Sequence, residues 1–488
     1  MSLSVNEIKR FIEGDATSER KQSAAVGARY YDASHDILKC RLFYYNTDGK
    51  LVEDTTRSNI RISHPFFTIL VDQLAAYMLS SKENPIRAKK NEDGFQDILD
   101  EHFDEEFWSE IAELITGAYA KGFEYLYAFK NAENKLVFQC ADSMGVVEVR
   151  EKDTDDGCKY VIYWYIDRVE KGKKTIKRIQ VWSENEVTYY VQSGANGKIV
   201  LDDSVETNPR PHIVYTDNKT GKKMGYGLGY IPFWRLDNNR KQFSGLKPIK
   251  ALIDDYDVHA CSLSNNLVDF DTPLYVVSGF QGDNLDELQQ NLKTKKIVGV
   301  DTEGGIDTNT VDIPYQARKE KLELDKEAIF TFGMGFDPTK VGDGNVTNVV
   351  ILSRYTLLDL KKSKFDKRLK KLLKEIIKVK LAEINQENDT DYQLSDIEID
   401  LTPDIPTNET ENIANEKVRA ETQQLRINTI LNVAATVGDE QTLKAICDEL
   451  DLSFEELRGQ LETMNNTADA RAMLGGITPE DEGAALNE

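Results

Sequence analysis

Residues 348–385 read NVVILSRYTLLDLKKSKFDKRLKKLLKEIIKVKLAEIN, and the wider segment Val346–Gln386 contains neither proline nor glycine. Its apolar residues recur in steps of three, four and seven, which fall on one face of an α-helix. These residues are Leu358, Phe365, Leu369, Leu372, Ile376 and Val379. The sequence therefore predicts a single long helix over Val346–Gln386, and the remaining elements are arranged around it.

The polar positions of this segment are mostly basic. The basic residues are Lys361, Lys362, Lys364, Lys367, Arg368, Lys370, Lys371, Lys374, Lys378 and Lys380. The chain around them is acidic, with 84 acidic and 61 basic residues and a net charge of -23. Two readings stay open: a solvated amphipathic helix whose lysine stems shield the apolar stripe, or a basic surface that meets an acidic or phosphate-bearing partner.

Length and composition place the chain among large globular proteins. A chain of 488 residues is expected to form roughly two to four structural units. Its five cysteines are far apart and form no CxxC pair, so we expect neither disulfides nor zinc, and infer a reducing compartment. No signal peptide and no run of eighteen apolar residues is present, so we expect no secretion and no membrane contact.

Several functions are disfavoured by missing motifs. The excess of acid argues against tight nucleic-acid binding, but not against a protein that lets DNA pass. Thr220–Lys223 (TGKK) lacks the spacing of an ATP-binding loop, and no nucleophile elbow is present. Clustered carboxylates could hold the metals of a nuclease, although such clusters also arise by chance in an acidic chain; they are Asp254, Asp255, Asp257, Asp269 and Asp271. We expect no catalytic residue, no metal and no cofactor.

The first half of the chain changes from helical to strand periodicity. We expect helices over residues 3–38 with a break at Gly14, a hairpin or loop over 41–53, a helix that begins at Pro65, and another over 103–120. From Gly122 to about Tyr215 the apolar period becomes two, which predicts a mainly antiparallel sheet. His64 beside Pro65 is interpreted as a local hydrogen-bonding residue.

The second half predicts two helices that bracket a small α/β unit. The first helix starts at Pro248 and carries His259 within its apolar stripe, so we expect that histidine to be packed. The unit consists of a strand, a short helix over 283–293, a second strand, the turn Glu303–Gly305 and a third strand. The second helix runs from about Gln316 to Met334.

This second helix has two distinct faces. Leu322, Ile329 and Phe332 define its apolar side, and the opposite side carries Glu320, Glu327 and Thr331, with Glu323 on its flank. Glycine, proline and asparagine then predict a loop over 335–348. Later we expect a strand at 397–401, helices over 409–437 and 440–464, and a disordered tail over 465–488.

Six strings in a fixed order resemble the portal proteins of tailed bacteriophages, in the siphophage branch. They are RYYDASHDIL (29–38), NIRISHPFFTILVDQLAAYML (59–79), GFEYLYAF (122–129), YIPFW (230–234), LKPIKALIDDYDVHACSLSNNLVDF (246–270) and IEIDLTPDIPTNETE (397–411). The likeness extends to about residue 465. It departs at Ser80–Pro85, where the family usually has a Gly-Lys-Pro-like turn, and this puts only the local loop in doubt.

The resemblance implies a helix-rich α+β portal fold with a wing, paired stem helices, a small α/β clip, a long wing helix and a helical crown. Its parts map as 1–121 helical wing, 122–245 β-rich wing, 246–271 stem helix, 272–315 clip, 316–334 stem helix, 335–348 tunnel loop, 349–407 long wing helix and strand, 408–464 crown, and 465–488 tail. It further implies a ring, usually of twelve subunits, with DNA passing through its centre.

The resemblance also assigns candidate site residues. The tunnel loop supplies Gly335, Asp337, Pro338, Lys340, Gly342, Asp343, Gly344, Asn345 and Asn348. Its glycines would give backbone freedom and Pro338 would limit it, while Lys340, Asn345 and Asn348 would touch DNA transiently. The stem would present Glu320, Glu323, Glu327 and Thr331 to the channel, where the acids repel phosphate. On the long helix, Lys367, Arg368, Lys371 and Lys374 would meet an acidic neighbouring subunit or phosphate.

The partners implied are other copies of the chain, double-stranded DNA without sequence specificity, the large terminase subunit, a head-completion or adaptor protein, the scaffold and the major capsid protein. The implied location is the capsid vertex of the virion, after assembly in the host cytoplasm. Two alternatives remain: a metal-dependent nucleic-acid enzyme, and a structural capsid or neck protein without a DNA channel.

Overall fold

The computed structural model describes most of the chain, namely residues 3–55, 57–81, 83–90, 94–131, 135–150, 157–170, 174–194, 196–216, 223–269, 274–280, 300–309, 314–340, 348–404, 409–450 and 453–454. The chain divides into two compact units: residues 1–341 with 353–405, and residues 342–352 with 406–488. Helices outweigh strands, and the paired strands are antiparallel. The fold is therefore helix-rich α+β, as predicted.

Five helices build the first part of the larger unit. They are α1 (Val5–Ala16), α2 (Glu19–Tyr31), α3 (Phe66–Met78), α4 (Phe95–His102) and α5 (Glu105–Lys121). The predicted break at Gly14 is wrong, because that glycine lies inside α1 with nothing near it. The helix ends at Ala16, and the hydroxyl of Ser18 caps α2 by accepting the amide of Lys21, the third residue of that helix. Pro65 directly precedes α3, as expected.

The β-rich part contains two sheets and a ribbon where a single sheet was expected. The first sheet has the order β14 (Phe233–Asp237), β4 (Phe123–Lys130), β5 (Leu136–Ala141). The second has the order β10 (Ile199–Leu201), β9 (Glu186–Ser193), β8 (Lys174–Trp182), β7 (Tyr160–Glu170), β6 (Val146–Val149), with β11 (Arg210–Pro211) on β9. The ribbon pairs β12 (Ile213–Thr216) with β13 (Lys223–Tyr226). The antiparallel prediction is confirmed, but the chain changes sheet at the tight turn between Asp142 and Gly145, which local periodicity does not reveal.

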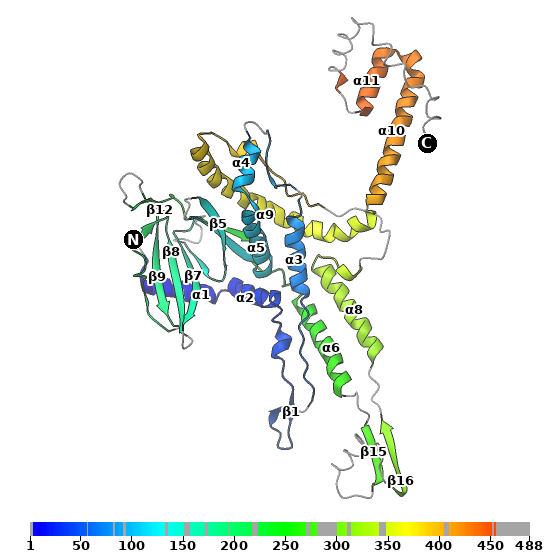
Figure 1. The fold of residues 1–488 in the computed structure, drawn as a ribbon. Helices are drawn as coiled ribbons and strands as arrows, with labels where there is room; N and C mark the ends of the chain where they lie inside the picture. Colours follow the sequence, from blue (N-terminus) through cyan, green and yellow to red (C-terminus); the bar gives the residue numbers. More distant parts are fainter. Residues whose placement is uncertain are drawn as a thin grey trace, which may run out of the picture. The chain divides into compact units, whose positions relative to one another are not determined.

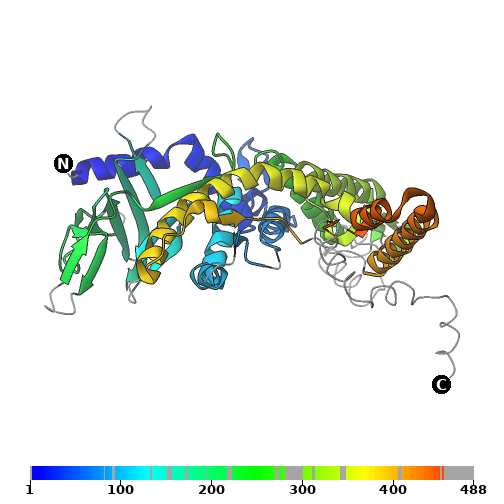
Figure 2. The same ribbon diagram turned by 90° about the horizontal axis from the view of Figure 1, so that it is seen from above.

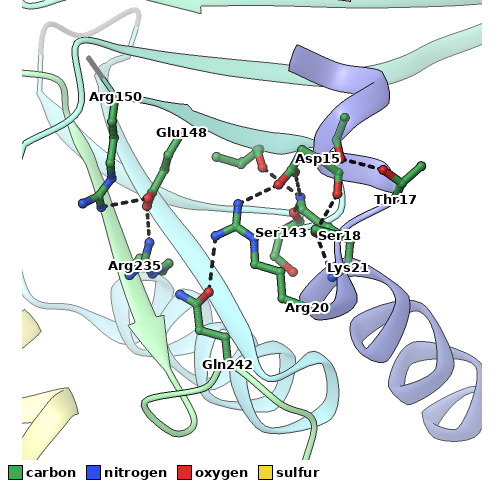
Figure 3. A network of polar contacts seen from close by, with 12 residues as sticks. Asp15, Thr17, Ser18, Arg20, Lys21, Ser143, Glu148, Arg150, Arg235 and Gln242 are labelled. Carbon is green, nitrogen blue, oxygen red and sulfur yellow. Dashed lines mark hydrogen bonds and ion pairs between the residues drawn. The ribbon is translucent and has the colours of Figure 1, made fainter. Parts of the chain in front are cut away.

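A buried polar junction fastens the N-terminal helices to both sheets (Figure 3). Asp15 pairs with Arg20 at 2.6 Å and with Lys21 at 3.0 Å, and the Lys21 ammonium also donates to the carbonyl of Val146 at 2.8 Å. Arg20 reaches Gln242, far along the chain, at 3.3 Å. Burial lowers the pKa of Lys21 despite its partner Asp15, so the junction holds its charge only because each group is bonded.

Two helices lie side by side and lead to a strand pair at their far end (Figure 1). They are α6 (Lys250–Asp269) and α8 (Tyr315–Phe332), and the strands are β15 (Leu274–Phe280) and β16 (Val300–Asn309). Both predicted helices are confirmed within two residues of their expected starts. The expected turn at Glu303–Gly305 falls inside β16, at the point where the register against β15 shifts between the pairs Ser278–Gly305 and Phe280–Val300. The chain is therefore irregular there, but it continues as one strand. The short helix expected over 283–293 lies outside the described residues.

The long helix predicted from the opening stretch is confirmed as α9 (Asn348–Asn388). It runs past the helical core of the larger unit (Figure 2), and one apolar face of it belongs to the main core. All six stripe residues named above are buried or half-buried, Leu369 and Ile376 completely. The short strand β17 (Ile397–Ile399) follows and pairs with β3 (Ile86–Ala88), which confirms the expected strand.

The smaller unit contains α10 (Glu409–Val437) and α11 (Asp439–Leu450), packed on each other. Gly438, with φ of +94°, makes the turn between them, and Arg426 of α10 pairs with Glu449 of α11 at 3.1 Å. Both helices were predicted. The second was expected to reach 464, and its continuation, like the tail 465–488, lies outside the described residues.

Candidate functional site: the helix pair, the loop after it and the basic helix

One lysine joins the two paired helices. The ammonium of Lys321 on α8 donates to Asp255 of α6 at 2.6 Å and to Asp325 one turn along α8. Asp325 is buried. Hydrogen bonds to these carboxylates raise the pKa of Lys321, and the bond from Lys321 lowers the pKa of Asp255. The pair is therefore clamped by charge across its contact face.

A second clamp fixes an extended arm, residues 58–64, along α6. The backbone amides of Ser58, Ile60, Ile62 and His64 bond to side chains spaced four apart on the helix. Those side chains belong to Asp269, Asn265, Cys261 and Asp257. Two residues of extended chain rise about 6.6 Å and four helical residues about 6 Å, so the two repeats stay in register.

The upper end of this ladder is a buried carboxylate between two histidines. Nδ1 of His35 lies 2.6 Å from Oδ2 of Asp257, and Nδ1 of His64 lies 2.7 Å from Oδ1. Burial raises the pKa of Asp257, but hydrogen bonds from the two histidines outweigh it, and the net pKa is lowered. His64 does form hydrogen bonds, as predicted, but with a partner 193 residues away, so the expectation of a local partner is wrong.

The predicted acidic face of α8 is present. Glu320, Glu323, Glu327 and Thr331 are all exposed. The three glutamates line one shallow hollow of about 480 Å³, together with Leu324, Lys326, Asp337 and Thr339. The structure thus gathers three predicted stem residues and one predicted loop residue on a single surface.

The apolar side of α8 differs from the prediction at one position. Ile329 is fully buried, but Phe332 is 61% exposed. Its place in the interior is taken by Phe330, which packs edge-on against Phe66 with ring centres 5.9 Å apart. The last turn of α8 therefore presents an aromatic ring outward.

The first half of the predicted tunnel loop is anchored in the interior. Gln73 of α3 brackets Phe336, accepting from its amide at 3.3 Å and donating to its carbonyl at 2.8 Å. A Cβ on Gly335 would lie 2.3 Å from Leu70 Cδ2 and 2.7 Å from Gln73 Oε1. The expectation that Gly335 supplies backbone freedom is therefore wrong, because close packing against α3 requires the glycine.

Asp337 and Pro338 are also placed, at the start of a short 3₁₀ turn over 338–340. The Asp337 carboxylate pairs with Lys326 at 2.8 Å and accepts the amide of Thr339 at 3.0 Å. Burial raises its pKa, but these bonds lower it overall. Lys340 ends the 3₁₀ turn and Asn348 begins α9, while Gly342, Asp343, Gly344 and Asn345 lie outside the described residues.

Three lysines of α9 are buried, contrary to the expectation of a solvated basic row. Lys361 donates to the carbonyls of Leu70 at 3.0 Å and Gly333 at 3.3 Å and lies 4.0 Å from the centre of the Tyr119 ring. Burial lowers the pKa of Lys361 to about 7. Lys362 pairs with Asp366 at 3.7 Å, and Lys380 pairs with Glu383 at 2.8 Å. Neighbouring elements cover these positions, which no pattern within the helix could show.

The four lysine and arginine positions singled out on α9 remain at the surface. Lys367, Lys371 and Lys374 are exposed, and Arg368 is half-buried, donating to the carbonyl of Asn238 at 3.0 Å. A groove of about 860 Å³ runs beside two of them. Its lining includes Lys247, Lys361, Lys364, Lys367 and Arg368 over an aromatic floor of Phe243, Phe332 and Phe365. No acidic residue is among the described side chains that line it.

Four of the five acids considered as metal ligands are described, and they do not converge on one site; Asp271 lies outside the described residues. Asp254 accepts from Tyr30 and pairs with Lys250, while Asp255 and Asp257 have the separate partners given above. Within the described ranges, no group of three potential ligands could hold a metal ion. The side chain of His259 is 41% exposed and lies 3.5 Å from Asp255, so the expectation of a packed histidine is wrong. The buried residues of α6 are instead Ile253, Asp257 and Cys261.

Sequence reasoning missed the residues that fix this architecture: Lys361, Asp257 and Asp325. Only Asp257 left a usable signal, since it shares a four-residue repeat with Cys261, Asn265 and Asp269.

Among the helices that the structure describes, none is both long and apolar enough to cross a membrane. All five cysteines are free thiols.

Comparisons with known proteins identify relatives of this chain. A family model described as phage portal protein, SPP1 Gp6-like, matches residues 13–461. The portal protein of Bacillus phage SPP1 is 27% identical over 376 residues, 75% of this chain and 72% of that protein. The portal protein of Clostridium phage phiCD119 is 26% identical over 401 residues, 76% of this chain and 82% of that protein. A chain from the neck of a native GTA particle, computed with C12 symmetry, is 13% identical, with 78% of this chain and 89% of that chain covered and a TM-score of 0.38.

The class of protein is thus that of the phage portals, which are structural proteins. Because the family model spans nearly the whole sequence, the chain belongs to the SPP1 Gp6-like family of phage portal proteins.

Proposed function

We propose that copies of this portal chain form a ring, usually of twelve, that passes double-stranded DNA through its centre during packaging and ejection. The observation that carries the proposal is the exposed acidic face of α8 on a helix whose opposite side is clamped to α6. Glu320, Glu323 and Glu327 are exposed, whereas Asp325, on the side that faces α6, is buried and bonded to Lys321.

The negative charge of this face suits a channel that must let DNA pass without binding it. Rows of glutamates around a ring would repel the phosphates from every side, so the duplex would stay centred and free to slide. Contacts to phosphate need no base recognition, so passage is independent of DNA sequence. In this proposal α6 and α8 are the stem, β15 and β16 belong to the clip, the two sheets to the wing, and α10 and α11 to the crown.

The loop after α8 would then be the narrow part of the channel. Its first residues, Gly335–Pro338, are held by α3 and α8, so we expect them to stay in place as DNA passes. Lys340, Asn345 and Asn348 are the proposed transient DNA contacts. The exposed lysines Lys367, Lys371 and Lys374 of α9 would meet acidic surface of the neighbouring copy or DNA phosphate.

We further propose that the ring sits at one capsid vertex of the virion and is assembled in the host cytoplasm. Its partners there would be the large terminase subunit, the head-completion or adaptor protein, the scaffold and the major capsid protein. The chain would catalyse no reaction, in keeping with the separate partners of Asp254, Asp255 and Asp257.

The test combines mass, image and charge variants. Light scattering of the purified protein should give about twelve times the 55.4 kDa chain mass, and end-on electron-microscope views should show a central hole. Reversing all three glutamates to lysine should leave the ring intact but slow DNA packaging, because the positive face would hold phosphate. A matched triple reversal at Glu13, Glu186 and Glu398, exposed acids of other elements, should leave packaging unchanged.

The alternatives give different results. A compact dimer without an opening would overturn the proposal, and rings whose hole cannot admit a duplex would favour a neck protein without a channel. Cleavage of DNA in the presence of Mg²⁺, abolished by Asp254→Asn, would favour the nucleic-acid enzyme.

A further inference from the structure

The hairpin over residues 43–53, which precedes the arm over 58–64, carries apolar side chains on both faces, and they are uncovered. It pairs β1 (Phe43–Tyr45) with β2 (Leu51–Glu53), Tyr44 opposite Val52 and Tyr45 opposite Leu51. All six residues are exposed, Tyr45 by 74% and Leu51 by 58%. A two-stranded ribbon with no covered face is marginal in water, so this surface requires a partner.

The hairpin is held in a defined place. At its base Arg41 pairs with Glu53 at 3.1 Å, and Arg61 donates to the carbonyls of Leu38 and Cys40 at 3.1 Å each. The arm that follows is fastened to α6 by the ladder described above, whose last rung joins Ser58 to Asp269. The apolar tip is therefore presented beside the C-terminal end of α6 (Figure 1).

The same end of the helix pair carries an uncovered apolar surface of its own. Leu267 and Val268 on α6 are 52% and 56% exposed, and Tyr315, the first residue of α8, is 57% exposed. The chain's own hairpin leaves them open to solvent. One chain thus exposes two apolar surfaces at the same level of the helix pair.

We propose that the hairpin over 43–53 docks on the neighbouring copy's surface formed by Leu267, Val268 and Tyr315, and so closes the ring head to tail. The inference rests on the proposed function, in which α6 and α8 line the channel along the ring axis. Rotation about the ring axis does not change the height of a residue along that axis. A hairpin beside the C-terminal end of α6 is therefore at the height of the same end of α6 in the next copy. Two different patches that fit each other form a heterologous contact, which generates a ring when the rotation closes.

The experiment uses the full chain in a Cys40→Ser background, since Cys40 is an exposed thiol next to the hairpin. Chains carrying Tyr45→Cys and chains carrying Leu267→Cys are co-assembled and treated with a short bis-maleimide. Only contact between different copies can then give a linked dimer of one chain of each kind. The decoy replaces the second chain by Phe332→Cys, which is equally exposed but about 25 Å away along α8.

We expect linked dimers from the first mixture, and only background levels from the decoy and from each single variant alone. Equal linkage in the decoy, or none in the first mixture while rings are visible, would overturn the docking. If the unaltered protein forms no ring at all, the proposed function fails first, so the two failures are distinct.

A second variant measures the contribution of the contact. Serine at Tyr44, Tyr45 and Leu51 should shift the protein from ring to monomer on dilution, with an unchanged circular-dichroism spectrum because these side chains are exposed. Serine at Ile166 and Val169, similarly exposed on β7, should leave the ring intact. If the hairpin variant forms normal rings that are no longer incorporated into capsids, the hairpin binds the capsid protein instead of the neighbouring copy, and the proposal is contradicted.

Discussion

Replacing Lys361 by methionine should remove a pH dependence from the stability of the larger unit. This lysine of α9 is almost fully buried against α3, α5 and the end of α8, and burial lowers its pKa from 10.5 to about 7. Methionine has a similar length and no charge, so the substitution removes the titration while filling most of the space.

The sign and size of the effect follow from proton linkage. Below about pH 7 the lysine is charged in both the folded and the unfolded chain, and the folded state bears the full cost of the buried charge. Between pH 7 and 10.5 the unfolded chain binds more protons than the folded one, so stability rises with pH by about 1.4 kcal/mol for each pH unit. The full span corresponds to a cost on the order of 5 kcal/mol, of which two carbonyl bonds and the Tyr119 ring recover a part.

The assay is urea unfolding of both proteins from pH 6 to pH 9.5 at one protein concentration. The quantity to follow is the difference between their free energies of unfolding, because other titrating groups cancel in it. We expect the unaltered protein to gain about 2 to 3 kcal/mol on the variant between pH 7 and 9, with no change between pH 6 and 6.5. A difference that is constant across the range would refute the reasoning and show that the carbonyls and the ring hold the charge at an ordinary pKa.

Three substitutions, the first of them with a matched control, test the remaining anchors. Gly335→Ala should destabilise the protein by about 1 to 3 kcal/mol in urea unfolding, because its Cβ would strike Leu70; Gly14→Ala, in open space within α1, should instead stabilise by about 0.5 to 1 kcal/mol. Asp257→Asn should cost about 3 kcal/mol at pH 7 and flatten the acid limb, since the lowered pKa gives stability that is present above about pH 4 and lost as pH falls through the folded value. Asn265→Ala should speed hydrogen exchange at the Ile60 amide that bonds to it, and unchanged exchange there would contradict the ladder.

Periodicity was enough for the long elements. α9, α6, α8 and α10 were predicted close to their observed bounds. For α9, α6 and α8 this follows from a buried stripe whose residues recur at intervals of three and four. The strands were recognised by their period of two, yet their division into two sheets was not. The pairing of β14 with β4 joins Trp234 to Leu126, and such long-range partners leave no trace in a local pattern.

The roles of the candidate site residues could likewise be predicted from the sequence only in part. Glu320, Glu323 and Glu327 could be assigned to an exposed face because helix geometry alone sets their direction. Gly335 and Lys361 could not be interpreted correctly, since what decides their roles is contact with Leu70, a residue more than 260 positions earlier. Their residue types suggested a flexible backbone at Gly335 and a solvated side chain at Lys361. The residues around them instead pack closely against Gly335 and bury Lys361.

The sequence by itself determined the helical frame, the family and the acidic face of α8, because each is a property of residues near one another along the chain. Only the tertiary structure decided which charges are buried, which glycine is required by packing, and that the arm runs along α6 to present an uncovered hairpin. Burial and hydrogen bonding depend on the partners that folding brings together, and for Asp257, Lys361 and Gly335 those partners lie on other elements.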